Sequence, residues 1–279
     1  MATGNRDREY RRLAERLEQK REKLLLLFAP AEFICWLEQT GATACKLCAL
    51  PRQLDSILYE DLWSRERRCL LTSATLSVGG DFSRFMCQTG IDMLRQSRLM
   101  TVSKASPFDY RSHALLYLPM DMPFPDRGKR AYREAVAGRL EALREFRRSG
   151  NGVLLASDSA GEGIDLAGDI LSSLVVVKLP FPTPDPVLEY EKSQYGDFHG
   201  YLSEVIVPGM LMKLRQWIGR GIRRESDTCV FSILDCRAGG RYRNDILAAL
   251  PDMPVTDRIE DVGRFIRSNK PDGYFENEG

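Results

Sequence analysis

Short runs of consecutive apolar residues alternate along this chain with longer segments in which apolar residues recur at helical spacing. The runs that fit buried strands lie at residues 69–76, 114–120, 152–157, 172–181 and 228–236. Helical spacing predicts helices over residues 6–27, 54–62, 128–149, 204–224 and 242–250. Strands that alternate with helices in this way are typical of an α/β protein with a mainly parallel sheet, covered on both faces.

Two further short strands, at residues 33–38 and 42–50, predict a hairpin near the N-terminus. Cys45 and Cys48 lie in its second strand with the C-x-x-C spacing of many zinc sites. A structural zinc ion needs four ligands, but no second C-x-x-C pair follows and the chain has only 2 histidines. We therefore expect buried thiols here and no metal site.

Composition limits the class of protein more than it identifies a function. The 279 residues are 43% hydrophobic and 28% charged, with a net charge of +1. No run reaches the roughly 18 uncharged apolar residues of a membrane span, and the charged N-terminus lacks a signal-peptide core. The 7 cysteines are irregularly spaced, so we expect reduced thiols and a cytoplasmic location. The near-neutral total conceals a basic stretch at 213–243 and an acidic one at 185–204.

A glycine-rich loop, residues 157–168, follows the predicted strand at 152–157 and is the first candidate for chemistry. Its glycines allow close backbone approach to a ligand, and Glu162 and Asp165 can orient an arginine, a water or a ribose hydroxyl. A plain turn with a helix-capping aspartate explains the same residues equally well. The loop's Ser159 does not indicate a serine hydrolase, because the G-x-S-x-G motif is absent.

The predicted helix at 204–224 carries the second candidate. Gln216, Arg220 and Arg223 lie at i, i+4 and i+7 and so would share one face. Two arginines beside a glutamine suit a γ-phosphate, whose charge they would neutralise. Gly219 and Gly221 each cost about 1 kcal/mol inside a helix, which makes a simple solvated basic face less probable but leaves it open.

Hydroxyl side chains at the end of the predicted strand at 69–76 form the third candidate. Thr72, Ser73, Ala74 and Thr75 could couple a nucleotide site to a neighbouring domain. Capping of the next turn is a sufficient alternative explanation.

The order of these segments resembles the C-terminal half of the DinG/XPD-like superfamily 2 DNA helicases, from about residue 33 to residue 251. In that family residues 72–76 would be the third helicase motif, residues 162–165 the core of the fifth, and residues 216–223 the sixth. The resemblance implies a RecA-like second helicase domain and a composite ATP site between two such domains.

The resemblance also implies roles for individual residues. Arg220 and Arg223 would be arginine fingers, and Gln216 would position the nucleotide or the attacking water. Nucleotide contacts would extend to Gly219, Glu162, Gly163 and Asp165, of which the last two would couple the nucleotide state to the DNA track. Coupling and nucleic-acid contacts would come from Thr72, Ser73, Ala74, Thr75, Ser157 and Ser159.

The chain departs from the family in two respects. It contains neither a G-x-x-x-x-G-K-[ST] loop nor a D-E-x-H box. The phosphate cradle, the Mg²⁺ ligands and the iron–sulfur cysteines of the family belong to a first RecA-like domain, of which only residues 31–76 resemble the closing piece. In addition, the predicted helix at 128–149 runs directly into the strand at 152–157, so the fourth motif is missing and the sheet would be one strand short.

We therefore expect a charged N-terminal helix (1–30), the closing piece of a first RecA-like domain (31–76), a C-terminal RecA-like domain (77–267) and a flexible tail (268–279). The expected function is part of an ATP-dependent, 5′→3′ DNA helicase that uses ATP with Mg²⁺ and acts on single-stranded or forked DNA. We expect no iron–sulfur cluster in this chain and little activity without a Walker-containing first domain. The alternative is a non-catalytic nucleic-acid-binding or regulatory remnant that works with a separately encoded Walker-containing partner.

Overall fold

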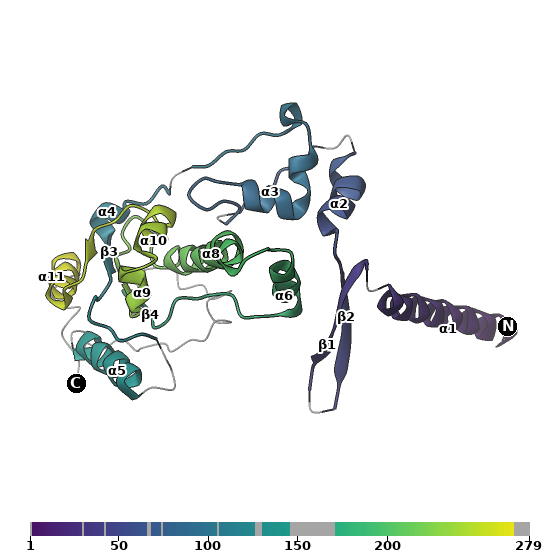
Figure 1. Ribbon diagram of the computed structural model, residues 1–279, viewed down its shortest axis with the longest axis horizontal. Coiled ribbons are helices and arrows are strands. Elements are labelled where there is room, and N and C mark those ends of the chain that lie inside the picture. Colours follow the sequence, from purple (N-terminus) through teal and green to yellow (C-terminus); the bar gives the residue numbers. More distant parts are fainter. Residues whose placement is uncertain are drawn as a thin grey trace. The chain divides into compact units, whose positions relative to one another are not determined.

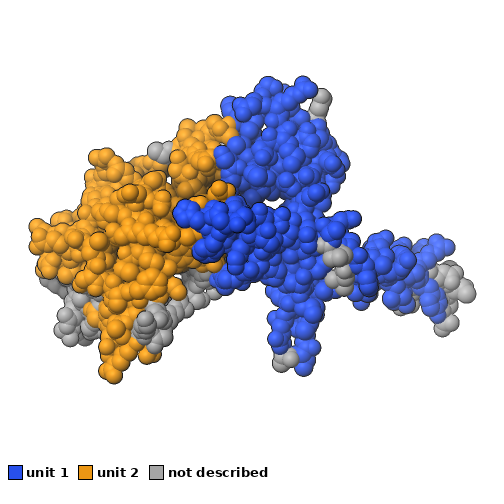
Figure 2. Space-filling model, viewed as in Figure 1, with its two compact units in different colours: residues 1–70, 83–100, 183–201 blue, residues 71–82, 101–182, 202–279 orange. Residues whose placement is uncertain are grey.

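The computed structural model describes residues 2–29, 31–41, 43–65, 68–73, 75–104, 106–125, 130–145 and 171–270. The predicted strand at 152–157 and the glycine-rich loop at 157–168 lie outside these ranges. The chain divides into two compact units (Figure 2). Unit 1 comprises residues 1–70, 83–100 and 183–201, and unit 2 comprises residues 71–82, 101–182 and 202–279. These units do not test the predicted domain boundaries, which stay a prediction.

Unit 2 is built on a parallel sheet. Its strands in the described part of the chain are β3 (Ala114–Tyr117), β4 (Ser173–Val176), β5 (Cys229–Ile233) and β6 (Val255–Thr256), in the order β4-β5-β3-β6. Every neighbouring pair runs parallel. The predicted α/β class with a parallel sheet is confirmed, and the strands expected within 114–120, 172–181 and 228–236 are present.

Helices cover both faces of this sheet (Figure 1). Leu116 and Phe231 point to one face and pack with α8 (Val207–Ile218) and α10 (Arg243–Ala249). Leu115 and Val230 point to the other face, because side chains alternate along a strand, and they pack with α5 (Arg130–Glu145) and α11 (Ile259–Asn269). Within its described residues, unit 2 also contains α4 (Tyr110–His113), α9 (Cys236–Gly239) and a π-helical turn (Leu202–Ile206) that precedes α8. The apolar strand runs are explained by this burial on two sides.

Unit 1 holds the predicted hairpin, with β1 (Phe33–Gln39) antiparallel to β2 (Cys45–Pro51). Its helices are α1 (Ala2–Leu25), α2 (Leu54–Leu58), α3 (Ser83–Thr89), α6 (Pro186–Ser193) and α7 (Phe198–Tyr201). The helix predicted at 54–62 is therefore present, although α2 continues as a π-helical turn over Tyr59–Trp63.

The buried strand predicted at 69–76 is wrong. The described residues of this segment form no strand, and Leu70 is 89% exposed. Ser73 Oγ lies 3.0 Å from Thr75 Oγ1 and accepts the Thr75 N–H. The polar end of the run therefore makes its hydrogen bonds locally, within a turn. A short apolar run forms a strand only where a neighbouring strand accepts its hydrogen bonds.

Two other expectations also differ from the structure. Cys45 is exposed and Cys48 is half-buried, because the hairpin is a two-stranded ribbon and not part of a covered sheet. Helix α11 was not predicted; it runs to Asn269 and is followed by the buried Lys270.

Candidate functional site

The turn that follows α8 carries the two arginines singled out in the sequence. Helix α8 ends at Ile218, so the helix predicted to reach residue 224 is too long. The N–H groups of Gly219 and Arg220 bond to the carbonyl oxygens of Arg215 and Trp217 at 2.9 and 3.1 Å, which closes the last turn. Gln216, Arg220 and Arg223 therefore do not share one helix face, since the last two lie in the turn.

Gly221 fixes this turn against the sheet. A Cβ atom at this position would lie 2.5 Å from Cε1 of Phe231 and 2.8 Å from Sγ of Cys229, both on β5. Its neighbour Ile222 is buried in the core next to α8. The glycine is required by close approach, because any side chain would displace the core. Arg220 and Arg223 are both half-buried and lie on either side of Gly221 and Ile222 in the sequence.

Asp227 holds the other end of the turn. Its Oδ2 atom accepts the backbone N–H groups of Arg223 and Arg224, each at 2.9 Å, and the residue is only 2% exposed. The sequence reasoning did not single out this aspartate, although an aspartate three residues after an arginine pair fits the side-chain-to-backbone capping common in turns. The backbone of Arg223 is thus fixed from both sides.

Arg215, on the last turn of α8, connects this helix to the hydroxyl-rich segment. Its Nη1 atom donates to the carbonyl oxygen of Ser77 at 3.3 Å. Thr72 and Ser73 are exposed, while the Ser73–Thr75 contact is local. The structure therefore brings the end of this segment to α8, and the hydroxyls themselves fit the capping explanation.

Six predicted site residues lie outside the described residues, so their roles stay predictions. They are Ala74, Ser157, Ser159, Glu162, Gly163 and Asp165. Among the described site residues, Gln216 and Gly219 are exposed beside the turn.

A groove of about 570 Å³ lies beside Arg215. Gly79 and Gly80, with φ of +59° and +86°, form one wall, and Lys104 and Arg111 contribute positive charge. Arg111 is paired with Asp252, which also lines the groove. This mixed lining suits a polar ligand without specifying its class.

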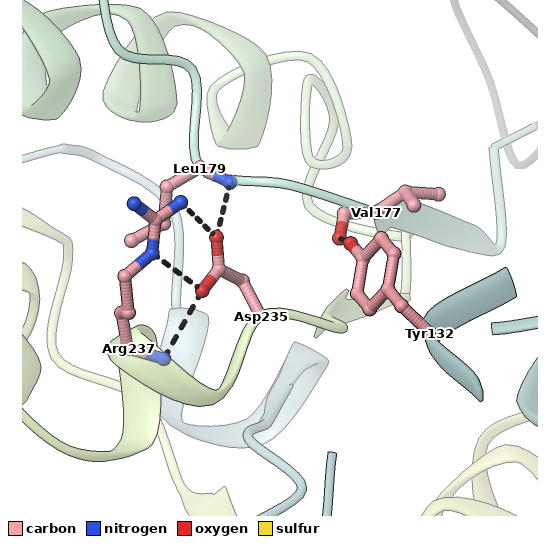
Figure 3. Close-up of polar contacts among 5 residues, drawn as sticks. All are labelled: Tyr132, Val177, Leu179, Asp235 and Arg237. Atoms are coloured by element: carbon pink, nitrogen blue, oxygen red, sulfur yellow. Dashed lines mark hydrogen bonds and ion pairs between the residues drawn. The ribbon is translucent and has the colours of Figure 1, made fainter. Parts of the chain in front are cut away.

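A second cluster lies at the carboxyl ends of β4 and β5 (Figure 3). Asp235 is fully buried and accepts the Leu179 N–H at 3.0 Å. It also accepts the Arg237 backbone N–H at 3.1 Å, Nε–H at 3.0 Å and Nη2–H at 2.7 Å. Hydrogen bonding to Asp235 raises the pKa of Arg237 above its already high value. The sequence reasoning missed this cluster.

The Arg237 guanidinium also contacts two aromatic rings. Its Cζ atom lies 4.8 Å from the ring centroid of Phe181 and 5.2 Å from that of Phe124. Nearby, the Tyr132 hydroxyl donates to the Val177 carbonyl oxygen at 2.6 Å and ties α5 to the end of β4 (Figure 3). The loops after β3, β4 and β5 therefore meet at one arginine, on the edge of a parallel sheet where α/β proteins bind ligands.

The described residues contain no group of three or more His, Cys, Asp or Glu side chains placed to hold a metal ion. Among the same residues, no helix is long and apolar enough to cross a membrane.

Comparison with known proteins identifies the family. A helicase C-terminal domain model matches residues 112–253, which is 142 of the 279 residues. The chain is 30% identical over 244 residues to the ATP-dependent DNA helicase YoaA of Escherichia coli, a match that covers 71% of this chain and 37% of that protein. It is 28% identical over 253 residues to the ATP-dependent DNA helicase DinG of Photobacterium profundum, covering 72% of this chain and 36% of that protein.

A third relative, named 3′-5′ exonuclease DinG in Bacillus subtilis, is 24% identical over 313 aligned positions, covering 90% of this chain and 33% of that protein. The chain thus spans well under half the length of these relatives. The matched domain includes β3, β4, β5 and the turn that carries Arg220 and Arg223. On this match and its parallel α/β sheet, the chain belongs to the helicase C-terminal domain family, as a RecA-like domain of the DinG type.

Proposed function

We propose that this chain is the C-terminal motor part of an ATP-dependent DNA helicase and supplies arginine fingers to a composite ATP site. The observation that carries the proposal is the turn after α8. Gly221 packed against Phe231 and Asp227 bonded to the backbone of Arg223 fix the positions from which two arginines project. The names of the relatives, ATP-dependent DNA helicases, support ATP and DNA as the substrates.

In this site Arg220 and Arg223 would neutralise charge that develops on the γ-phosphate during in-line attack by water. A fixed backbone matters because preorganised charges stabilise a transition state without reorganising at the moment of reaction. Exposed Gln216 would orient the nucleotide or the water, next to Gly219. Mg²⁺ would supply further charge neutralisation, and its ligands would come from a Walker-containing first domain.

Coupling to DNA would use the segment from Thr72 to Thr75, since Ser77 just beyond it accepts a hydrogen bond from Arg215 on α8. Glu162, Gly163 and Asp165 would add nucleotide contacts, and Ser157 and Ser159 would contact the nucleic acid. The track would be single-stranded or forked DNA, followed in the 5′→3′ direction.

The first prediction concerns ATP hydrolysis. We expect the purified chain to hydrolyse little or no ATP, because its sequence contains no G-x-x-x-x-G-K-[ST] loop to cradle the β- and γ-phosphates. Addition of a Walker-containing first domain from a DinG relative should produce turnover stimulated by single-stranded DNA, as measured by phosphate release. Arg223→Ala should abolish that turnover, whereas Arg224→Ala, at the exposed neighbouring position, should retain it.

Robust turnover by the chain alone that Arg223→Ala abolishes would contradict the composite site. A chain that binds single-stranded DNA in a salt-sensitive manner but yields no turnover with any Walker-containing partner would instead support the alternative of a non-catalytic binding module.

A further inference from the structure

The cluster around Arg237 has the composition of a surface that stacks a base. Phe124 is 64% exposed and lies in the loop after β3, with the guanidinium of Arg237 at 5.2 Å from its ring centroid. A planar guanidinium beside an aromatic ring holds that ring in a defined orientation. The exposed part of the ring remains available to a ligand.

The arginine beneath this ring is itself rigid. Asp235, fully buried, accepts both Nε–H and Nη2–H of Arg237, and Phe181 packs at 4.8 Å from the guanidinium carbon. Phe181 is held in turn by Tyr242, with ring centroids 5.5 Å apart. The second terminal nitrogen, Nη1, points away from the Asp235 carboxylate (Figure 3). Arg237 is therefore already held in place beside Phe124 before a ligand binds. Binding on the Phe124 ring would lose little conformational entropy in this arginine.

Charge indicates which way a polyanion would cross this edge of the sheet. The cluster around Arg237 is formed by the loops after β3, β4 and β5. A hollow of about 290 Å³ is formed by the loops after β3 and β6. Among the residues that the structure describes, that hollow is lined by the acidic Asp121, Asp257 and Glu260 and by one basic residue, Arg258. Because β6 is the far strand in the order β4-β5-β3-β6, repulsion by these carboxylates favours a path over the β4–β5 side.

We propose that Phe124 and Arg237 form a nucleotide-binding platform in which a base of single-stranded DNA stacks on Phe124 and Arg237 Nη1 donates to the adjacent phosphate. This inference rests on the proposed function, which supplies single-stranded DNA as the ligand, and adds the residues that hold one nucleotide. Stacking of this kind tolerates any base sequence, as a translocating motor requires.

The test is a binding titration of the full chain with a fluorescein-labelled oligothymidylate, at fixed salt and without nucleotide. Phe124→Ala should weaken binding by about fivefold or more, as loss of one base–aromatic stack does. Phe198→Ala, which removes a ring that is also 64% exposed but lies in unit 1, is the matched control and should bind as the parent chain does.

Two further measurements separate stacking from a structural effect. On an abasic strand of the same length, the parent chain and Phe124→Ala should bind equally, since no base remains to stack. The Phe124→Trp variant should bind the oligothymidylate at least as tightly as the parent chain does. The bound oligothymidylate should also quench the fluorescence of the introduced indole.

Equal binding of oligothymidylate by the parent chain and Phe124→Ala would overturn the platform and leave the proposed function in place. No detectable binding of single-stranded DNA by the parent chain would overturn the platform and also the nucleic-acid track of the proposed function.

Discussion

Gly221 shows how a single residue connects the site to the core. Helix propensity explains why a glycine disfavours a longer α8, but it does not explain why glycine is needed at this position. The reason is Phe231, which is 1% exposed and would lie 2.5 Å from a new Cβ atom. No sequence pattern predicts a contact between a turn and a strand that begins several residues later.

This contact yields a prediction for stability. Gly221→Ala should lower the free energy of unfolding by about 1–3 kcal/mol, the usual cost of an extra methyl group in a packed core. Urea denaturation followed by circular dichroism would measure it. Gly138→Ala is the control, because a Cβ atom there meets nothing within 4 Å and alanine favours its helix, α5. An unchanged midpoint in Gly221→Ala would show that the turn is not pressed on Phe231.

Among the elements of the chain, those predicted best are the ones whose burial is uniform. The strands within 114–120, 172–181 and 228–236 could be read from the sequence because both faces of the sheet are covered. The run at 69–76 has a similar apolar start, but nothing in the sequence shows that it lacks a strand partner.

The site residues divide in the same way. Arg220 and Arg223 stand out by their charge and spacing, whereas Asp227 and Asp235 become visible only through what they bond. In the sequence, Asp235 cannot be distinguished from an ordinary turn residue at the end of a strand. Only the structure shows its hydrogen bonds to Leu179 and Arg237.

Helix α11, which the sequence reasoning did not predict, carries a prediction about pH. The Thr256 hydroxyl donates a hydrogen bond to the Asp261 carboxylate at 2.6 Å. This bond is the largest cause, and a hydrogen bond from Arg264 the second, of a pKa of Asp261 below its usual value. A native pKa below that of the unfolded chain means that the ionised carboxylate stabilises the fold above the unfolded pKa. This stabilisation disappears as the pH falls through the native pKa.

Thr256→Val should therefore raise the native pKa of Asp261 toward its usual value, as followed by carboxyl-carbon NMR during an acid titration. The pKa of Asp109, which is lowered chiefly by Ser112, should stay low in the same variant. If the Asp261 pKa did not move, the hydroxyl would not be the main cause of the shift.

At the scale of the whole molecule, each unit is assembled from three separate stretches, so the chain passes between the units at residues 70, 82, 100, 182 and 201. The buried residues that form the two clusters of unit 2 begin at Tyr110, with Val78 packed against one of them. No described side chain of helix α1 belongs to either cluster, and its Tyr10 and Leu17 are 68% and 60% exposed.

Removal of residues 1–29 should accordingly leave the stability of unit 2 unchanged. Hydrogen exchange at the β5 amides, which lie in the centre of the sheet next to β3 and β4, would report this directly. Faster exchange at those amides in the shortened chain would show that the N-terminal helix supports the core after all.

The contact between Gly221 and Phe231 also couples substitutions at these two positions. A larger residue at position 221 overpacks the core, and a smaller residue at position 231 leaves a cavity, so the two changes compensate each other only when they are made together. A designer who wishes to change the spacing of Arg220 and Arg223 must therefore also redesign the hydrophobic core that packs against the turn.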